Sequence, residues 1–202
     1  MSFFEFIRHR CQYNQEVIKT INQVMYLIEQ KENQGSLEAP LALVGPVQSG
    51  KTKTFLGVAA QCLDQSYDTV VILTKSNLAL AEQTYHRVIH DFSLCDSLYS
   101  PIGSNQLSVN FITKVQNQWL KLGKESVKQI IVVLKEKSHC ERLLNLMSYY
   151  RDQKVLLIDD EADYGSLSYD EDHQPTLIMK MITEIRNFFN GRDPGAKGLC
   201  AY

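Results

Sequence analysis

Two groups of residues in the sequence have the types and spacing that phosphate chemistry requires. The first fits the phosphate-loop pattern G-x-x-x-x-G-K-[ST] and consists of Gly45, Pro46, Val47, Gln48, Ser49, Gly50, Lys51 and Thr52. Glycines in such a loop let backbone N–H groups point at an anion, and the N-terminus of the following helix adds a positive field. We therefore expect Lys51 to contact the β- and γ-phosphates of a nucleotide and Thr52 to ligate Mg²⁺.

The second group is a cluster of carboxylates, Asp159, Asp160, Glu161 and Asp163, which directly follows an apolar run. Carboxylates this close repel one another unless they meet a cation or water. With Mg²⁺ present, Asp160 would hold the metal and Glu161 would take a proton from the water that attacks the γ-phosphate. An Asp-Glu pair alone is more often a solvated turn, but its occurrence together with a phosphate loop indicates a catalytic pair.

The elements that must position these residues alternate along the chain. Apolar, β-branched runs predict strands at residues 41–44, 69–73, 108–112, 129–134, 154–158 and 199–202. Apolar residues at helical spacing predict helices at residues 14–31, 53–64, 78–89, 138–147 and 175–189. This alternation predicts an α/β domain with a mainly parallel sheet and helices on both faces. Ligands of such sheets bind at the carboxyl ends of the strands, so both motifs are expected to lie in one cleft.

Capping residues predict where some of these helices begin. Either Ser76 or Asn77 can cap the helix that starts near residue 78. Ser138 and Glu141 have the spacing of a capping box, and Pro175 is expected at the first position of the last helix.

Length and composition limit the possible classes of protein. A chain of 202 residues is long enough for one sizeable core, and 44% apolar with 22% charged residues is typical of a soluble globular protein. Five scattered cysteines without a C-x-x-C pair argue against a zinc site and a disulfide framework. With neither a secretory signal nor a run of eighteen apolar residues, we expect a cytoplasmic protein without a membrane partner. At a net charge of −2, any nucleic-acid contact must come from a local group of residues.

The order of the motifs resembles the first ATPase lobe of superfamily 2 helicases, the DEAD-box-like group. Between the two motifs, Leu73-Thr74-Lys75 with Leu80 and Gln83-Thr84 is similar to that superfamily's motif Ia, which touches the backbone of a bound strand. A closer likeness is to the helicase-like Z-one domain of bacterial proteins associated with endonuclease and phage-defence systems. Its patterns G-x-V-Q-S-G-K-T, Q-T, V-V-V-L-K and I-D-D-E-A-D are similar to residues 45–52, Gln83-Thr84, Val132-Val133-Leu134-Lys135 and residues 158–163.

The resemblance covers about residues 38–202 and implies a RecA-like P-loop NTPase fold. It implies a RecA-like ATP-binding lobe at residues 38–202, truncated before motif III and the second lobe. Residues 1–37 lie outside the resemblance and are expected to form an N-terminal helical extension. ATP and Mg²⁺ are the implied cofactors, with Lys51, Asp160 and Glu161 as catalytic residues and Thr52 and Asp160 as metal ligands. The implied partner is nucleic acid, with DNA expected, and Lys75, Gln83, Thr84 and Arg87 are the implied contacts.

The resemblance also implies that a second ATPase lobe or a partner protein supplies an arginine finger. Such a finger accounts for about 10³ to 10⁵ in rate in related chemistry, so this chain alone is expected to bind nucleotide better than it hydrolyses it. Two alternatives stay open at this point. One is another P-loop NTPase, such as a small-molecule kinase, and the other is a truncated nucleotide-binding module that regulates or interacts without turnover.

Overall fold

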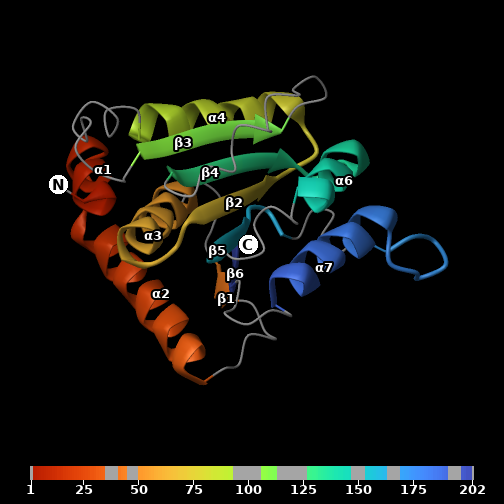
Figure 1. Ribbon diagram of the computed structural model, residues 1–202, viewed down its shortest axis with the longest axis horizontal. Helices are drawn as coiled ribbons and strands as arrows, with labels where there is room; N and C mark the ends of the chain where they lie inside the picture. Colours follow the sequence, from red (N-terminus) through yellow and green to blue (C-terminus); the bar gives the residue numbers. More distant parts are fainter. Residues whose placement is uncertain are drawn as a thin grey trace.

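The computed structural model describes residues 2–34, 41–44, 50–92, 106–112, 127–146, 153–162, 169–190 and 197–201. Within them lies a six-stranded sheet in which every strand pair is parallel, in the order β1-β6-β5-β2-β4-β3 (Figure 1). The strands are β1 (Leu41–Leu43), β2 (Thr69–Thr74), β3 (Gln106–Ile112), β4 (Val127–Leu134), β5 (Val155–Asp159) and β6 (Lys197–Ala201). The predicted parallel sheet is therefore confirmed.

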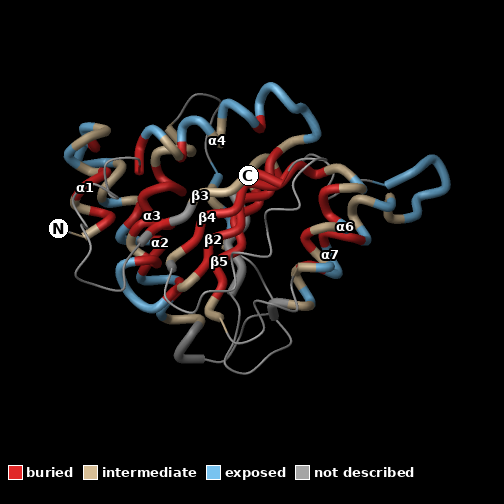
Figure 2. Tube along the Cα trace, turned by 45° about the horizontal axis from the view of Figure 1, so that its top comes forward, coloured by how far each residue is buried: buried red, intermediate tan, exposed pale blue. Residues whose placement is uncertain are grey.

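Helices cover both faces of this sheet, as predicted (Figure 2). On one face lie α1 (Phe3–Arg10), α2 (Gln15–Gln34), α3 (Lys51–Gln65) and α4 (Leu78–Phe92), and on the other lie α6 (Lys137–Leu146) and α7 (Leu177–Asn190). Alternate residues of β2 point to the two cores: Val70 and Ile72 to the first, Val71 and Leu73 to the second. None of the helices in the described ranges has the length and apolar character needed to cross a membrane.

The strand order places the carboxyl ends of β1 and β5 close together. The chain passes from β1 outward to β2 and β3 and then returns through β4 and β5 to β6, which lies between β5 and β1. Right-handed crossovers that run in opposite directions place their helices on opposite faces of a sheet. A crevice forms at the carboxyl ends of the strands where the direction changes, and β1 and β5 both end there.

The two N-terminal helices pack on α3 and belong to the same core as the sheet. Ile7 of α1 and Ile21 of α2 are fully buried in the cluster that contains Phe55 of α3. The carboxylate of Asp64, near the end of α3, accepts hydrogen bonds from the backbone N–H groups of Phe3 at 2.7 Å and Phe4 at 2.8 Å. Helix α1 was not predicted from the sequence. Residues 35–40 lie outside the described ranges, so the predicted boundary at residue 37 stays a prediction.

Helix α2 packs tightly against α3 at Gly57, which leads to a first prediction. A Cβ atom at Gly57 would clash with Cδ1 of Ile21 and lie 3.0 Å from Cε2 of Tyr13. Ile21 has no exposed surface and little room to shift. We expect Gly57→Val to lower the free energy of unfolding by about 1–3 kcal/mol, the usual cost of overpacking a core. Urea unfolding measures this change.

The matched control is Ala79→Val, which places a valine at an exposed position of α4. Combining Gly57→Val with Ile21→Ala should cost less than the sum of the two single changes, because the shorter side chain makes room. A loss in Gly57→Val no larger than in Ala79→Val would contradict the close packing of α2 on α3.

Candidate functional site

The end of the predicted phosphate loop forms the start of α3. Gly50 is the N-cap of α3 and has φ +83°, in the left-handed region that favours glycine. A Cβ atom there would meet nothing within 4 Å, so the backbone conformation and not a lack of space requires glycine. Lys51 and Thr52 follow in the first turn, whose N–H groups have no acceptor within the helix. Gly45, Pro46, Val47, Gln48 and Ser49 lie outside the described residues.

The acidic cluster begins at Asp159, the last residue of β5, and continues into the turn after it. Asp160 donates its backbone N–H to the carbonyl of Leu73 at 2.9 Å, which fixes the turn against the end of β2. Burial raises the pKa of the Asp160 carboxyl, and the negative charge of Glu161 raises it further, while the ammonium groups of Lys135 and Lys51 oppose the shift. Asp160 is therefore a carboxylate that a nearby cation would stabilise. Asp163 lies outside the described residues.

Both groups open into one cavity of about 680 Å³. Its described lining residues are Gln12, Asn14, Val17, Gly50, Lys51, Thr52, Lys53, Arg87, Asp160 and Glu161. Lys51 and Thr52 thus lie in the same cavity as Asp160 and Glu161, as expected from their places after β1 and β5. A cavity of this size is ample for a nucleotide-sized ligand.

One wall of the cavity comes from the connection between α1 and α2, which sequence reasoning did not assign to the site. Asn14 caps α2 by accepting a hydrogen bond from the N–H of Val17 at 2.8 Å. The hydroxyl of Tyr13 donates to the carbonyl of Lys53 at 2.8 Å, and Nζ of Lys53 donates to the carbonyl of Cys11 at 3.1 Å. These reciprocal bonds hold the connection against the first turn of α3. The capping residue was visible in the sequence, but its place beside residue 50 depends on tertiary packing.

Glu161 is held at both its backbone and its side chain. Its φ is +54°, in the left-handed region, where a non-glycine residue is strained by about 1–3 kcal/mol. Nζ of Lys135 donates to its carbonyl oxygen at 2.7 Å, and Nζ of Lys75 lies 3.1 Å from its Oε2 atom. The backbone conformation of Glu161 is thus supported by a lysine from the end of β4, while a lysine from the end of β2 contacts its carboxylate.

The four residues predicted to contact nucleic acid are divided between two places. Lys75 pairs with Glu161, and Arg87 lines the cavity. Gln83 and Thr84 are not among the described residues that line the cavity, and Gln83 is exposed on α4. Their predicted role in binding a strand stays a prediction.

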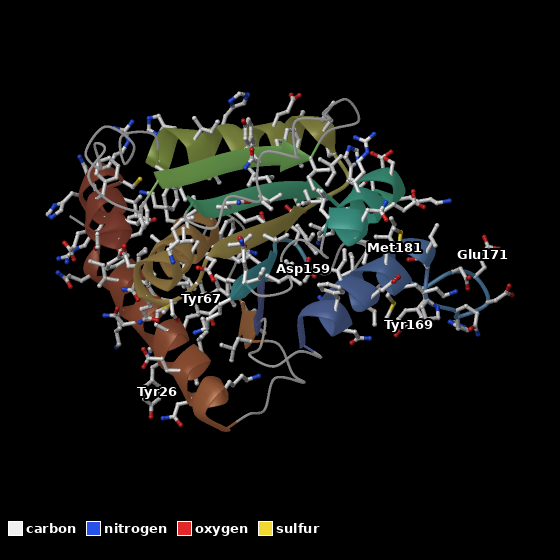
Figure 3. The ribbon with its side chains drawn as sticks, viewed as in Figure 1. Tyr26, Tyr67, Asp159, Tyr169, Glu171 and Met181 are labelled. Atoms are coloured by element: carbon white, nitrogen blue, oxygen red, sulfur yellow. The ribbon has the colours of Figure 1, made fainter. Side chains whose placement is uncertain are left out.

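Asp159, one residue before Asp160, is fully buried at the centre of the molecule (Figure 3). Its Oδ1 atom lies 2.7 Å from Nζ of Lys135, and its Oδ2 atom accepts a hydrogen bond of 2.5 Å from Arg186 of α7. Sequence reasoning did not find this network. The only available signal was that Lys135 and Asp159 each stand at the end of an apolar strand.

The donor atoms of the site suit a hard cation. The hydroxyl of Thr52 and the carboxylate of Asp160 offer oxygen ligands, which Mg²⁺ prefers. Within the described ranges, no group of three or more His, Cys, Asp or Glu side chains could hold a metal ion. The hydroxyl of Thr52 and the carboxylate of Asp160 fit Mg²⁺, which is usually bound by one or two carboxylates together with phosphate oxygens and water.

Comparison with models of known protein families found no match, and comparison with curated proteins found none either. What the cavity does must therefore follow from the chemistry of its own residues.

The raised pKa of Asp160 leads to a prediction about stability. A carboxyl whose pKa is higher in the folded state destabilises the fold as the pH rises from its ordinary value of 3.8 through the raised value. Asp160→Asn removes this charge, so we expect it to raise the free energy of unfolding by about 1 kcal/mol at pH 7. The difference should shrink as the pH falls towards 3.8. Urea unfolding in Mg²⁺-free buffer at several pH values measures it.

Asp172→Asn is the control, because Asp172 is exposed in the loop before α7 and lies away from the cavity. Equal stability of Asp160→Asn and the unmodified chain at pH 7 would show that burial of Asp160 imposes no electrostatic cost.

Proposed function

We propose that this chain is the Mg²⁺-dependent ATP-binding and ATP-hydrolysing lobe of a superfamily 2 helicase-like or translocase enzyme that acts on nucleic acid. The observation that carries the proposal is the cavity in which Lys51 and Thr52 lie with Asp160 and Glu161. A lysine at a helix N-terminus facing an acidic pair provides the groups that phosphoryl transfer needs. The parallel sheet, in which β1 and β5 are one strand apart, supports a RecA-like P-loop arrangement.

Each residue of the pair of motifs has a separate part in this proposal. Lys51 binds the β- and γ-phosphates of ATP, and Thr52 and Asp160 hold Mg²⁺. When bound, Mg²⁺ offsets the negative charge of the phosphates. Glu161 accepts a proton from the water that attacks the γ-phosphate, and Lys75 orients the carboxylate that does so.

The rest of the cavity is suited to the remainder of a nucleotide. Gln12, Asn14 and Arg87 bring polar groups, and Val17 brings an apolar surface, to the same cavity as the phosphate residues. A ligand with a charged end and a partly apolar, hydrogen-bonding end matches this division. We therefore expect the nucleoside to lie against the connection between α1 and α2.

The nucleic-acid partner and the second lobe rest on the resemblance of the motifs to superfamily 2 helicases. Lys75, Gln83 and Thr84 are the proposed strand contacts, and a second lobe or partner protein is the proposed source of the arginine finger. The chain alone is expected to bind ATP with little hydrolysis, because such a finger contributes about 10³ to 10⁵ in rate.

Nucleotide binding by the purified chain tests the proposal directly. A fluorescent ATP analogue is titrated with and without Mg²⁺, and with and without single-stranded DNA. Lys51→Ala should weaken binding by about 2 kcal/mol, or about 30-fold, because it removes a charged hydrogen bond to phosphate. Glu161→Gln should bind as the unmodified chain does and should lose whatever single-turnover hydrolysis the chain has.

Lys137→Ala, which removes an exposed lysine from α6, is the matched control and should leave binding unchanged. Equal affinity of Lys51→Ala and the control would refute the proposal. Hydrolysis at an unchanged rate in Glu161→Gln would refute the role of Glu161. Binding with little hydrolysis in the unmodified chain agrees with the proposal, because the arginine finger is expected from a second lobe or partner protein.

The cavity also yields a prediction for Arg87. We expect Arg87→Ala to weaken ATP binding by about 1.4 kcal/mol, or about tenfold, because the variant removes a cation from the cavity. Gln83→Ala, one helical turn earlier on the exposed side of α4, is the control and should have no effect on ATP. Unchanged ATP affinity in Arg87→Ala, with weaker binding of single-stranded DNA, would support the nucleic-acid role predicted from the resemblance instead.

A further inference from the structure

Lys135 is a buried lysine that reaches the turn formed by Asp160 and Glu161. It is not among the described residues that line the cavity. It follows the last residue of β4, and its side chain has no exposed surface. Strand β2 lies between β4 and β5, so the side chain passes the end of β2 to reach the turn after β5. There its ammonium group bonds to Oδ1 of Asp159 at 2.7 Å and to the carbonyl oxygen of Glu161 at 2.7 Å.

These two bonds bracket Asp160. One holds the side chain of the residue before it and the other holds the backbone of the residue after it, so the chain on both sides of Asp160 is tied to the end of β4. Glu161 has a left-handed backbone conformation that side chains other than glycine rarely adopt. Such a conformation persists only where the surroundings enforce it, and a charged donor to the carbonyl of that same residue is such an enforcement.

We propose that Lys135 is a positioning residue that holds the backbone of Glu161 in this conformation and so directs the carboxylates of Asp160 and Glu161 into the cavity. The inference rests on the proposed function, because its consequence is measured as Mg²⁺-dependent binding of ATP. Lys135 touches neither the nucleotide nor the metal and acts through the turn. A buried lysine with a merely structural role would contribute to stability without affecting the metal.

The chain contains a closely matched lysine for comparison. Lys128 lies near the opposite end of the same strand, donates to the carbonyl of Tyr67 at 2.6 Å and lies 3.6 Å from Oδ1 of Asp68. It therefore contacts a carbonyl and a carboxylate as Lys135 does, but it is partly exposed and lies at the amino end of the sheet, away from the cavity. Lys128→Met is the control for removing a lysine of this kind.

The experiment measures the affinity of each variant for a fluorescent ATP analogue, with Mg²⁺ and with a chelator. Lys135→Met should lower the Mg²⁺-dependent gain in affinity at least tenfold while leaving the affinity in chelator within a factor of two. Lys128→Met should keep the full gain. In an Asp160→Asn background, Lys135→Met should cause no further loss, because both changes act on the same turn.

A second variant guards against a folding defect. If Lys135→Met does not fold, Lys135→Met combined with Asp159→Asn removes both buried charges, and Arg186, which is partly exposed, remains next to the amide. A folded double variant without the Mg²⁺-dependent gain supports the positioning role. A full gain in Lys135→Met or in the double variant overturns it.

Lys51→Ala, measured in the same titration, separates this inference from the proposed function. If Lys51→Ala loses affinity but Lys135→Met keeps its Mg²⁺-dependent gain, only the role of Lys135 is wrong. If Lys51→Ala binds as the unmodified chain does, or if the unmodified chain does not bind ATP, both the proposed function and the role of Lys135 are wrong.

Discussion

The arrangement of the site depends on the ion pairs that the buried carboxylate of Asp159 makes. An ionised carboxylate without solvent exposure costs several kcal/mol unless cations compensate it. Here Lys135 from the end of β4 and Arg186 from α7 provide two cations, one to each oxygen. This requirement connects strand β5, strand β4 on the far side of β2, and helix α7 at a single carboxylate. Asp160 and Glu161 follow immediately, so their positions are set by the same compensation.

The other wall of the cavity depends mainly on apolar packing. Helices α1 and α2 bury their apolar sides on α3, and the close approach at Gly57 sets how near α2 can lie. The connection between them then forms bonds with the first turn of α3 through Tyr13 and Lys53. The cavity is thus formed between a strand end held by ion pairs and an N-terminal segment held by the hydrophobic core. Ion pairs on one side and apolar packing on the other are thus two independent sources of stability for the same cavity.

The sequence predicted the strands well because parallel strands buried on both faces must be continuously apolar, as β2 and β5 are. It predicted that the two motifs lie together because both follow apolar runs, although β1, unlike β5, is only partly buried in the described structure. It could not predict that Lys135 reaches past β2, since strand order is decided by long-range packing. The helical pattern of α4 indicated that Arg87 is exposed, but it could not show that Arg87 also lines the cavity. The contact with nucleic acid that the resemblance implies for Arg87 stays a prediction.

The first residues of the helices were also only partly predictable from the sequence. Asn77, one of the two candidates, caps α4 by accepting from the N–H of Leu80 at 3.2 Å. The capping box at Ser138 was wrong, since α6 begins at Lys137 and the N–H groups of its first turn donate to the carbonyl of Glu136. Pro175 does not begin α7. It pairs with Tyr169 in a bridge, and α7 begins at Leu177. Competing local interactions of similar strength decided each start.

The two lysine contacts of Glu161 differ in kind, and the difference suits the chemistry proposed for it. The pair with Lys75 is partly exposed on both sides, with 39% and 45% of the side chains accessible, and such pairs contribute about 0–1 kcal/mol. The bond from Lys135 to the backbone is buried and charged, which makes it harder to replace. A carboxylate that accepts a proton from water needs a fixed backbone. It also needs a side-chain partner that it can release, because it must contact the water instead. Glu161 has both, since its backbone is fixed from the interior while its side chain is held by a contact that water can replace.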